Sequence, residues 1–321
     1  MLARMYVVGI DENGLGPLLG PLVVTGAILE LDGEYEPAAL AAALAGGVRV
    51  DDSKAFMSHA NPAAGERTAL AFLDQLEEGR PPSADTLLQR LALPSPVSDR
   101  SCPAAARPLC HGPDLNLPCF GAQGDDAAAQ AALAAASTEL EGRLAAAGVR
   151  FVGAMCVTLC ARDFNRLVEV RGGKMALDLA LFEQVILAAH ERLARREALY
   201  LCGKIGSRKA YCKVLSLLKR FPGRTLAEEA ARSAYRAEGL GQVEFVRDGD
   251  ALHPPTALAS VIGKYVRELA MVRINRFLGE HLANSRPASG YRDPVTRALI
   301  ERSAALRREL RIPEECFCRI R

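Results

Sequence analysis

Residues 9–21 read GIDENGLGPLLGP and directly follow an apolar run, residues 6–8, that predicts a β-strand. Two adjacent acids, Asp11 and Glu12, end this strand, and a stretch rich in glycine and proline comes next. Carboxylates crowded at a strand end repel each other unless a cation or a proton offsets their charge. Glycines beside them allow another backbone, such as a phosphodiester chain, to come close. The segment therefore predicts a site for a hard metal ion beside a surface for a polyanion.

The composition limits the class of protein. A chain of 321 residues, half of them hydrophobic and about a quarter charged, is ordinary for a folded protein with a large core. The formal net charge is only +2, so the chain has no global basic field. Any surface for nucleic acid must then be a local patch.

The N-terminus and the cysteines indicate the compartment. The first residues reach Asp11 too soon for a signal peptide, and no apolar stretch is long enough to span a bilayer. The nine cysteines are an odd number with irregular spacing, which favours reduced thiols over a disulfide framework. We therefore expect a cytoplasmic monomer with no membrane partner.

The order of predicted elements indicates an α/β fold. The apolar run over 21–29 forms an antiparallel hairpin with the first strand. Further strands are predicted over 150–157, 199–202 and 243–246. Helices are predicted over 37–45, 174–196, 208–219 and 226–237, and one more begins at Pro254. This order predicts an α/β domain with a mixed sheet.

Residues 60–147 differ in character from the rest of the chain. Ala-rich helical stretches flank a middle part, 93–124, that is rich in proline and cysteine and has little periodicity. We interpret 60–147 as an insertion or lid within one domain that covers 1–321. Its Cys102, Cys110, His111 and Cys119 do not match a usual zinc spacing.

Other candidate site residues have plain structural alternatives. Asp250 follows the strand over 243–246, but an acid there also suits a helix N-cap, and Asp248 fits the spacing equally well. The basic turn over 203–209 is a usual way to hold a phosphate, although it lacks the P-loop spacing. Lys54, in the sequence Asp-Ser-Lys, either contacts phosphate or follows a plain N-cap. Tyr291 either stacks on a sugar or base or simply packs.

Taken in order, these segments resemble ribonuclease HII, the type 2 branch of the ribonucleases H. The family pattern G-x-D-E-x-G-x-G-P-x-x-G-P matches 9–21, and its D-S-K motif matches 52–54. An acid before a helix of the type A-A-S-I-x-A-K-x-x-R-D matches Asp250 and 257–268, and Gly290-Tyr291 matches part of a G-Y-P motif. The resemblance implies a ribonuclease H-like mixed β-sheet flanked by helices, with a helical and irregular insertion that the family does not explain.

The resemblance also implies an activity and a set of site residues. It implies an endonuclease that cleaves the RNA strand, or embedded ribonucleotides, of RNA–DNA hybrids with two Mg²⁺ or Mn²⁺ ions. The metal ligands would be Asp11, Glu12 and Asp250, which decides against Asp248. The substrate-binding positions would be Gly14, Leu15, Gly16, Ser53, Lys54, Lys204, Arg208, Lys264 and Tyr291, the last of them on the deoxyribose at an RNA–DNA junction.

Two departures from the family matter. Leu15 replaces the arginine of a G-R-G segment, which removes a hydrogen-bond donor near the ribose 2′-hydroxyl. Gly203 (or Cys202, one residue out of register) stands where the third catalytic acid is expected, and no acid lies nearby. We expect turnover at least ~10²-fold slower without that charge. A non-catalytic or inactivated hybrid-binding protein is therefore a rival hypothesis, and a mononucleotide site in a small-molecule enzyme is a weaker third.

Overall fold

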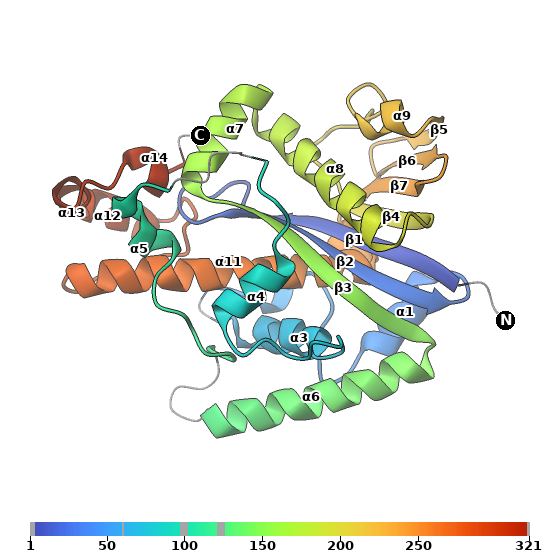
Figure 1. The fold of residues 1–321 in the computed structure, drawn as a ribbon, viewed down its shortest axis with the longest axis horizontal. Helices are drawn as coiled ribbons and strands as arrows, with labels where there is room; N and C mark the ends of the chain where they lie inside the picture. The colour runs from blue at the N-terminus through green and yellow to red at the C-terminus, as the bar shows by residue number, and fades with distance from the viewer. Residues whose placement is uncertain (1–3, 60, 97–101, 121–125, 320–321) are drawn as a thin grey trace.

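The computed structural model describes residues 4–59, 61–96, 102–120 and 126–319. Within them, one seven-stranded sheet has the order β3-β2-β1-β4-β7-β6-β5 (Figure 1). Its strands are β1 (Arg4–Asn13), β2 (Leu22–Asp32), β3 (Val149–Leu159), β4 (Ala198–Gly203), β5 (Gly223–Glu228), β6 (Arg232–Ala237) and β7 (Gly241–Val246). β1, β4 and β7 run parallel, and every other neighbouring pair is antiparallel. The predicted α/β class with a mixed sheet is confirmed.

β1 and β2 form the predicted hairpin. Their antiparallel register runs from Arg4 opposite Asp32 to Asn13 opposite Val23. Val7 lies on one face of the strand and Val8 and Ile10 on the other, and all three are fully buried. Both faces are therefore covered, which explains why this strand reads as a continuous apolar run.

Helices form a layer on each face of the sheet (Figure 1). α7 (Ala161–Arg171) and α8 (Lys174–Arg192) lie on one face, where Ile10 and Phe182 belong to the same core cluster. α1 (Pro37–Leu44), α3 (Ala63–Leu73), α6 (Asp126–Ala146) and α11 (Pro254–His281) lie on the other. The predicted helices over 37–45 and 174–196 and the helix start at Pro254 are thus present.

The start of α11 is seated directly on β1. A Cβ atom on Gly9 would lie 1.9 Å from the carbonyl carbon of Pro255 and 2.3 Å from the nitrogen of Thr256, so only glycine fits. The Thr256 hydroxyl donates a hydrogen bond to the carbonyl of Leu201 at 3.0 Å. These contacts fix the first turn of α11 over the two central strands.

The described parts of the segment over 60–147 pack on the face of the sheet that α11 covers. It contains α3, α4 (Ala84–Leu91), the short 3₁₀ helix η1 (Ala104–Ala106), α5 (Arg107–Cys110) and α6. Phe72 and Leu140 share a core cluster with Leu29 of β2. The buried carboxylate of Glu66 accepts the backbone N–H groups of Cys119 and Phe120, each at 2.7 Å. These contacts join the segment to the main core.

The helix predicted over 226–237 is wrong, because β5 and β6 occupy this stretch as an antiparallel pair. Its alanines and glutamates favour a helix, but β7 offers β6 a complete ladder of hydrogen bonds. Tyr235 becomes fully buried, and its hydroxyl contacts Glu228 across the pair. Tertiary pairing therefore overrides local propensity here.

The helix predicted over 208–219 is also wrong. Irregular chain and turns fill 208–216, and only α9 (Leu217–Arg220) is helical. Tyr211 is held by its surroundings: its N–H donates to the hydroxyl of Tyr235 at 2.8 Å, and its own hydroxyl accepts the N–H of Ile205 at 3.0 Å. These bonds and its stacking on Phe245 hold the segment in a non-helical path.

The remaining elements are short. They are α2 (Ser53–Phe56), α10 (Gly249–Leu252), α12 (Pro294–Arg302), α13 (Ala304–Glu309) and α14 (Glu314–Phe317). The last three pack around the end of α11 in a third core cluster. The nine cysteines are all free thiols, as their spacing predicted. Within the described ranges, every helix is too short or too polar to cross a membrane.

Candidate functional site

The ends of the three parallel strands lie together at one edge of the sheet. Ile10 of β1 pairs with Cys202 of β4, so the next residues, Asp11 and Gly203, are neighbours. Gly203 in turn pairs with Val246, the last residue of β7. Carboxyl ends of parallel strands are where α/β proteins gather ligands.

Gly203 faces the two acids of β1. A Cβ atom built on Gly203 would lie 2.7 Å from Oδ1 of Asp11 and 3.7 Å from Oε2 of Glu12. Both carboxylates thus turn toward a position that carries no side chain of its own. The residue at which the resemblance leads us to expect an acid is therefore in contact with the other two.

α10 brings Asp250 to the same edge. A Cβ atom on Gly249 would lie 3.8 Å from the Cα of Gly203 and 3.7 Å from the carbonyl oxygen of Cys202. Asp250, the next residue, is half-buried, whereas Asp248 is exposed. Asp248 has a left-handed backbone, with φ of 53°, and occupies the N-cap position of α10. Sequence spacing alone did not distinguish Asp248 from Asp250, but their surroundings in the structure differ.

A further acid, Asp178, was missed from the sequence. It lies on α8, is fully buried, and has no hydrogen-bond partner for either carboxylate oxygen among the described residues. Burial and the nearby charge of Asp11 raise the pKa of Asp178 to about 8. The available signal was an acid placed between Leu177 and Leu179, both of which are buried.

The acids at this edge are of the type that the predicted Mg²⁺ or Mn²⁺ would need. Carboxylate oxygens are the ligands these hard ions prefer, and Asp11 and Glu12 present theirs to one point. The unpartnered oxygens of Asp178 are a further fit. Over the described residues, however, no three His, Cys, Asp or Glu side chains are close enough together to hold a metal. The edge therefore offers suitable donors in an open arrangement.

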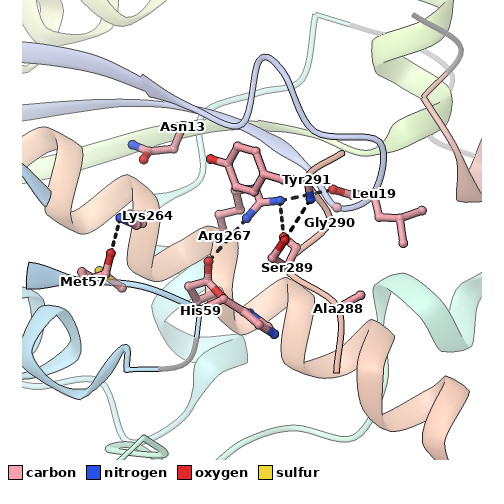
Figure 2. Close-up of polar contacts among 12 residues, drawn as sticks. Asn13, Leu19, Met57, His59, Lys264, Arg267, Ala288, Ser289, Gly290 and Tyr291 are labelled. Carbon is pink, nitrogen blue, oxygen red and sulfur yellow. Dashed lines mark hydrogen bonds and ion pairs between the residues drawn. The ribbon is translucent and has the colours of Figure 1, made fainter. Parts of the chain in front are cut away.

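The Asp-Ser-Lys segment is held against α11. The hydroxyl of Ser53 lies 3.0 Å from that of Ser260, and both residues are buried. The Lys264 ammonium donates to the carbonyl of Ser53 at 3.0 Å and to that of Met57 (Figure 2). The side chain of Lys54 lies outside the described part of the structure. Ser53 and Lys264 therefore fix α2 beside the strand ends.

Two buried arginines shape the glycine-rich loop over 14–20. Arg319 donates to the carbonyl of Gly14 and, at 3.0 and 2.6 Å, to that of Gly20. Gly14 has a φ of 92°, which a residue with a side chain rarely adopts. Burial and the charge of Arg267 lower the pKa of Arg319 to about 9. Sequence reasoning did not identify either arginine.

The outer part of this loop differs in exposure from its base. Leu15 is half-buried and packs against the cluster beneath α8. Gly16 is exposed, and a Cβ atom there would meet nothing within 4 Å. The backbone at Gly16 is thus open to an approaching chain.

Tyr291 is attached to the same loop (Figure 2). The Cζ atom of Arg267 lies 4.9 Å from the centroid of the Tyr291 ring. Tyr291 is nevertheless 49% exposed. The N–H groups of Leu18 and Leu19 donate to the carbonyl of Gly290 at 2.7 and 3.1 Å. The ring of Tyr291 is therefore exposed to solvent, while the backbone next to it is held by hydrogen bonds to the glycine-rich loop.

The basic turn after β4 is partly bound within the protein. The Lys204 ammonium donates to the carbonyl of Glu229 at 2.7 Å and to the hydroxyl of Ser233 at 3.2 Å. Burial, with the charges of Arg247 and Lys209, lowers the pKa of Lys204. Arg208 is exposed. Lys204 thus anchors the turn to the β5–β6 pair, while Arg208 points to the surface.

The chain is similar to solved structures of type 2 and type HIII ribonucleases H. With the structure of the PCNA:RNase HII complex from Archaeoglobus fulgidus it shares 16% identity over 99% of this chain and 95% of that chain, with a TM-score of 0.47. With Bst-RNase HIII in complex with Mn²⁺ it shares 16% identity over 100% of this chain and 68% of that chain, with a TM-score of 0.45. With ribonuclease H2 from Pyrococcus horikoshii OT3 it shares 15% identity over 98% of this chain and 92% of that chain, with a TM-score of 0.47.

No family model and no curated protein matches the chain. Because the identities and TM-scores are low, the assignment of chemistry depends on the residues of this chain.

Proposed function

We propose that this chain is a metal-dependent endoribonuclease that cleaves RNA within RNA–DNA hybrids. One observation carries the proposal: Asp11 and Glu12 converge on the end of β4, against which α10 seats the turn that holds Asp250. Two segments far apart in sequence, β1 and α10, thus bring acids to the end of β4. The glycine-rich loop and Tyr291 lie beside that edge, as a nuclease surface requires.

Asp11, Glu12 and Asp250 would hold Mg²⁺ or Mn²⁺. When bound, such ions activate water and stabilise the departing 3′-oxygen of a phosphodiester. The exposed backbone at Gly16 permits close approach of the hybrid, and the ring of Tyr291 stacks on a sugar. We further propose that Lys54, Lys204, Arg208 and Lys264 make a local basic patch for phosphate, with Ser53, Gly14 and Leu15 shaping the surface. The chain would act as a cytoplasmic monomer.

The second candidate is a protein that binds hybrids without cleaving them. Gly203 favours it, because the point on which Asp11 and Glu12 converge lacks a carboxylate. Removing one transition-state charge slows an enzyme by about 10²–10³-fold. The binder keeps Tyr291 and the basic patch but has little catalysis.

A cleavage assay distinguishes the two. The substrates are one duplex with a single embedded ribonucleotide and one with a long RNA tract, each with Mg²⁺ or Mn²⁺. The natural chain should cut slowly, Gly203→Asp should cut at least ~10²-fold faster, and Asp11→Asn should not cut. Cleavage by Gly203→Asp alone would identify the natural chain as a binder. Absence of both binding and cleavage in all variants would refute the proposal.

A further inference from the structure

We propose that Asp178 supplies, from helix α8, the carboxylate that strand β4 lacks at Gly203, and that it binds the divalent cation together with Asp11. This inference rests on the proposed function, because it concerns the same metal centre. It adds a ligand from an element that none of the sequence motifs includes.

The path of α8 brings Asp178 to the strand ends. Met175, one turn earlier, lies over the turn after β4, since a Cβ atom on Gly206 would be 2.2 Å from its Cε. Phe182, one turn later, stacks near Phe245 of β7, with ring centroids 6.5 Å apart. Residues three and four apart share a helix face. Asp178 therefore faces the region where β4 and β7 end.

Asp11 links Asp178 to position 203. The Oδ1 atom of Asp11 lies 2.7 Å from where a Cβ of residue 203 would be. Leu177 and Leu181, on the same helix as Asp178, share a core cluster with Ile10, the residue before Asp11. A side chain at 203 and the side chain of Asp178 are thus two ways to place a second carboxyl group beside Asp11.

Other buried acids in the described structure are paired, and Asp178 is the exception. Glu66 accepts two backbone N–H groups and the hydroxyl of Tyr265. Glu183, also on α8, accepts the hydroxyl of Ser216 at 2.7 Å and the N–H of Leu217 at 2.9 Å. Both oxygens of Asp178 have no such partner in the described residues. An unpaired buried carboxyl beside a second carboxylate is unfavourable in a purely structural role.

A divalent cation would resolve this arrangement. It would attract both carboxylates and occupy the lone pairs of Asp178 that no N–H or O–H group of the described residues reaches. The acid is then a ligand held ready on a rigid helix.

The test measures binding of Mn²⁺ alone by calorimetry, without nucleic acid. Asp178→Asn should weaken Mn²⁺ binding at least ~10-fold. Loss of a residue that only hydrogen-bonds to a metal ligand already costs about 10-fold in affinity, and loss of the ligand itself should cost no less. Glu183→Gln is the matched control, because it alters a buried and paired acid on the same helix and should leave the affinity unchanged. The double variant Gly203→Asp with Asp178→Asn returns a carboxylate to the strand and should recover the affinity.

Each outcome decides the matter. If Asp178→Asn binds Mn²⁺ as the natural chain does while Asp11→Asn does not, the inference about Asp178 fails and the metal-dependent function stands. If the natural chain binds no Mn²⁺, both fail. Circular dichroism checks folding, and Asp178→Ser provides a second variant should the asparagine protein not fold. A loss with either variant that the double variant does not recover would indicate a structural role and overturn the inference.

Discussion

Replacing Gly203 by aspartate should destabilise the metal-free protein, and a divalent cation should reverse the effect. The new Cβ would lie 2.7 Å from Oδ1 of Asp11, the end of a flexible side chain, so the steric cost should be small. The charge matters more. Two carboxylates about 4 Å apart repel by about 4 kcal/mol at an effective dielectric constant of about 20. Because Asp11 is half-buried and partly solvated, we expect a loss of about 2–4 kcal/mol in the free energy of unfolding.

Gly203→Asn is the matched control, because it adds nearly the same volume without the charge. At about 2 °C per kcal/mol for a protein of this size, the aspartate variant should melt about 4–8 °C below the asparagine variant in a chelator. Mn²⁺ at about 100 times its Kd adds about 2.7 kcal/mol to the free energy of unfolding of a variant that binds it. The difference in melting temperature between the two variants should therefore shrink or change sign when Mn²⁺ is present. Thermal melting with and without Mn²⁺ measures both. Equal melting temperatures for the two variants in chelator would refute the reasoning that residue 203 faces the acids of β1.

Three further predictions concern stability. Gly9→Ala should lower the free energy of unfolding by about 3 kcal/mol or more in urea titrations, because the new Cβ meets the backbone of α11; a loss below about 1 kcal/mol would contradict this contact. Arg319→Met leaves two loop carbonyls without their donor and should cost about 2–4 kcal/mol, with faster hydrogen exchange in the loop. Burial alone would raise the pKa of Glu30, but the hydrogen bond and charge of Arg150 help to lower it overall. Glu30→Gln should therefore be less stable than the natural chain at pH 7, and the gap should close as pH falls below 4.5, through the folded-state pKa; a gap independent of pH would count against this pairing.

The sequence predicted the centre of the fold well because its signals are local there. The acids and glycines of 9–21 directly follow a strand, and two apolar runs joined by a turn leave little choice but a hairpin. The strand before Gly203 and the helix start at Pro254 were also visible from apolar runs and proline. In the folded chain, the parallel pairing of the first strand with the strand before Gly203 places Asp11 beside position 203.

The rest depends on contacts between distant residues. The stretch over 226–237 has helical composition and becomes a strand pair only because β7 is available as a partner. Asp178 reads as an ordinary polar residue of a helix until the helix is laid over the sheet. Arg267 and Arg319 read as surface charges, yet both are buried and donate to carbonyls around the glycine-rich loop. Sequence periodicity does not carry this information.

The bond from Arg319 to Gly14 has a consequence for the timing of synthesis. The two residues are 305 positions apart, and ribosomes add about 5–20 residues per second. Gly14 therefore waits about 15–60 s for the residue that fixes its loop. Through that interval, a growing chain already carries Asp11 and Glu12 but lacks the anchor beside them. A chain that lacks residue 319 stays in that unfinished state, so the order of this loop depends on a residue made 305 positions after Gly14.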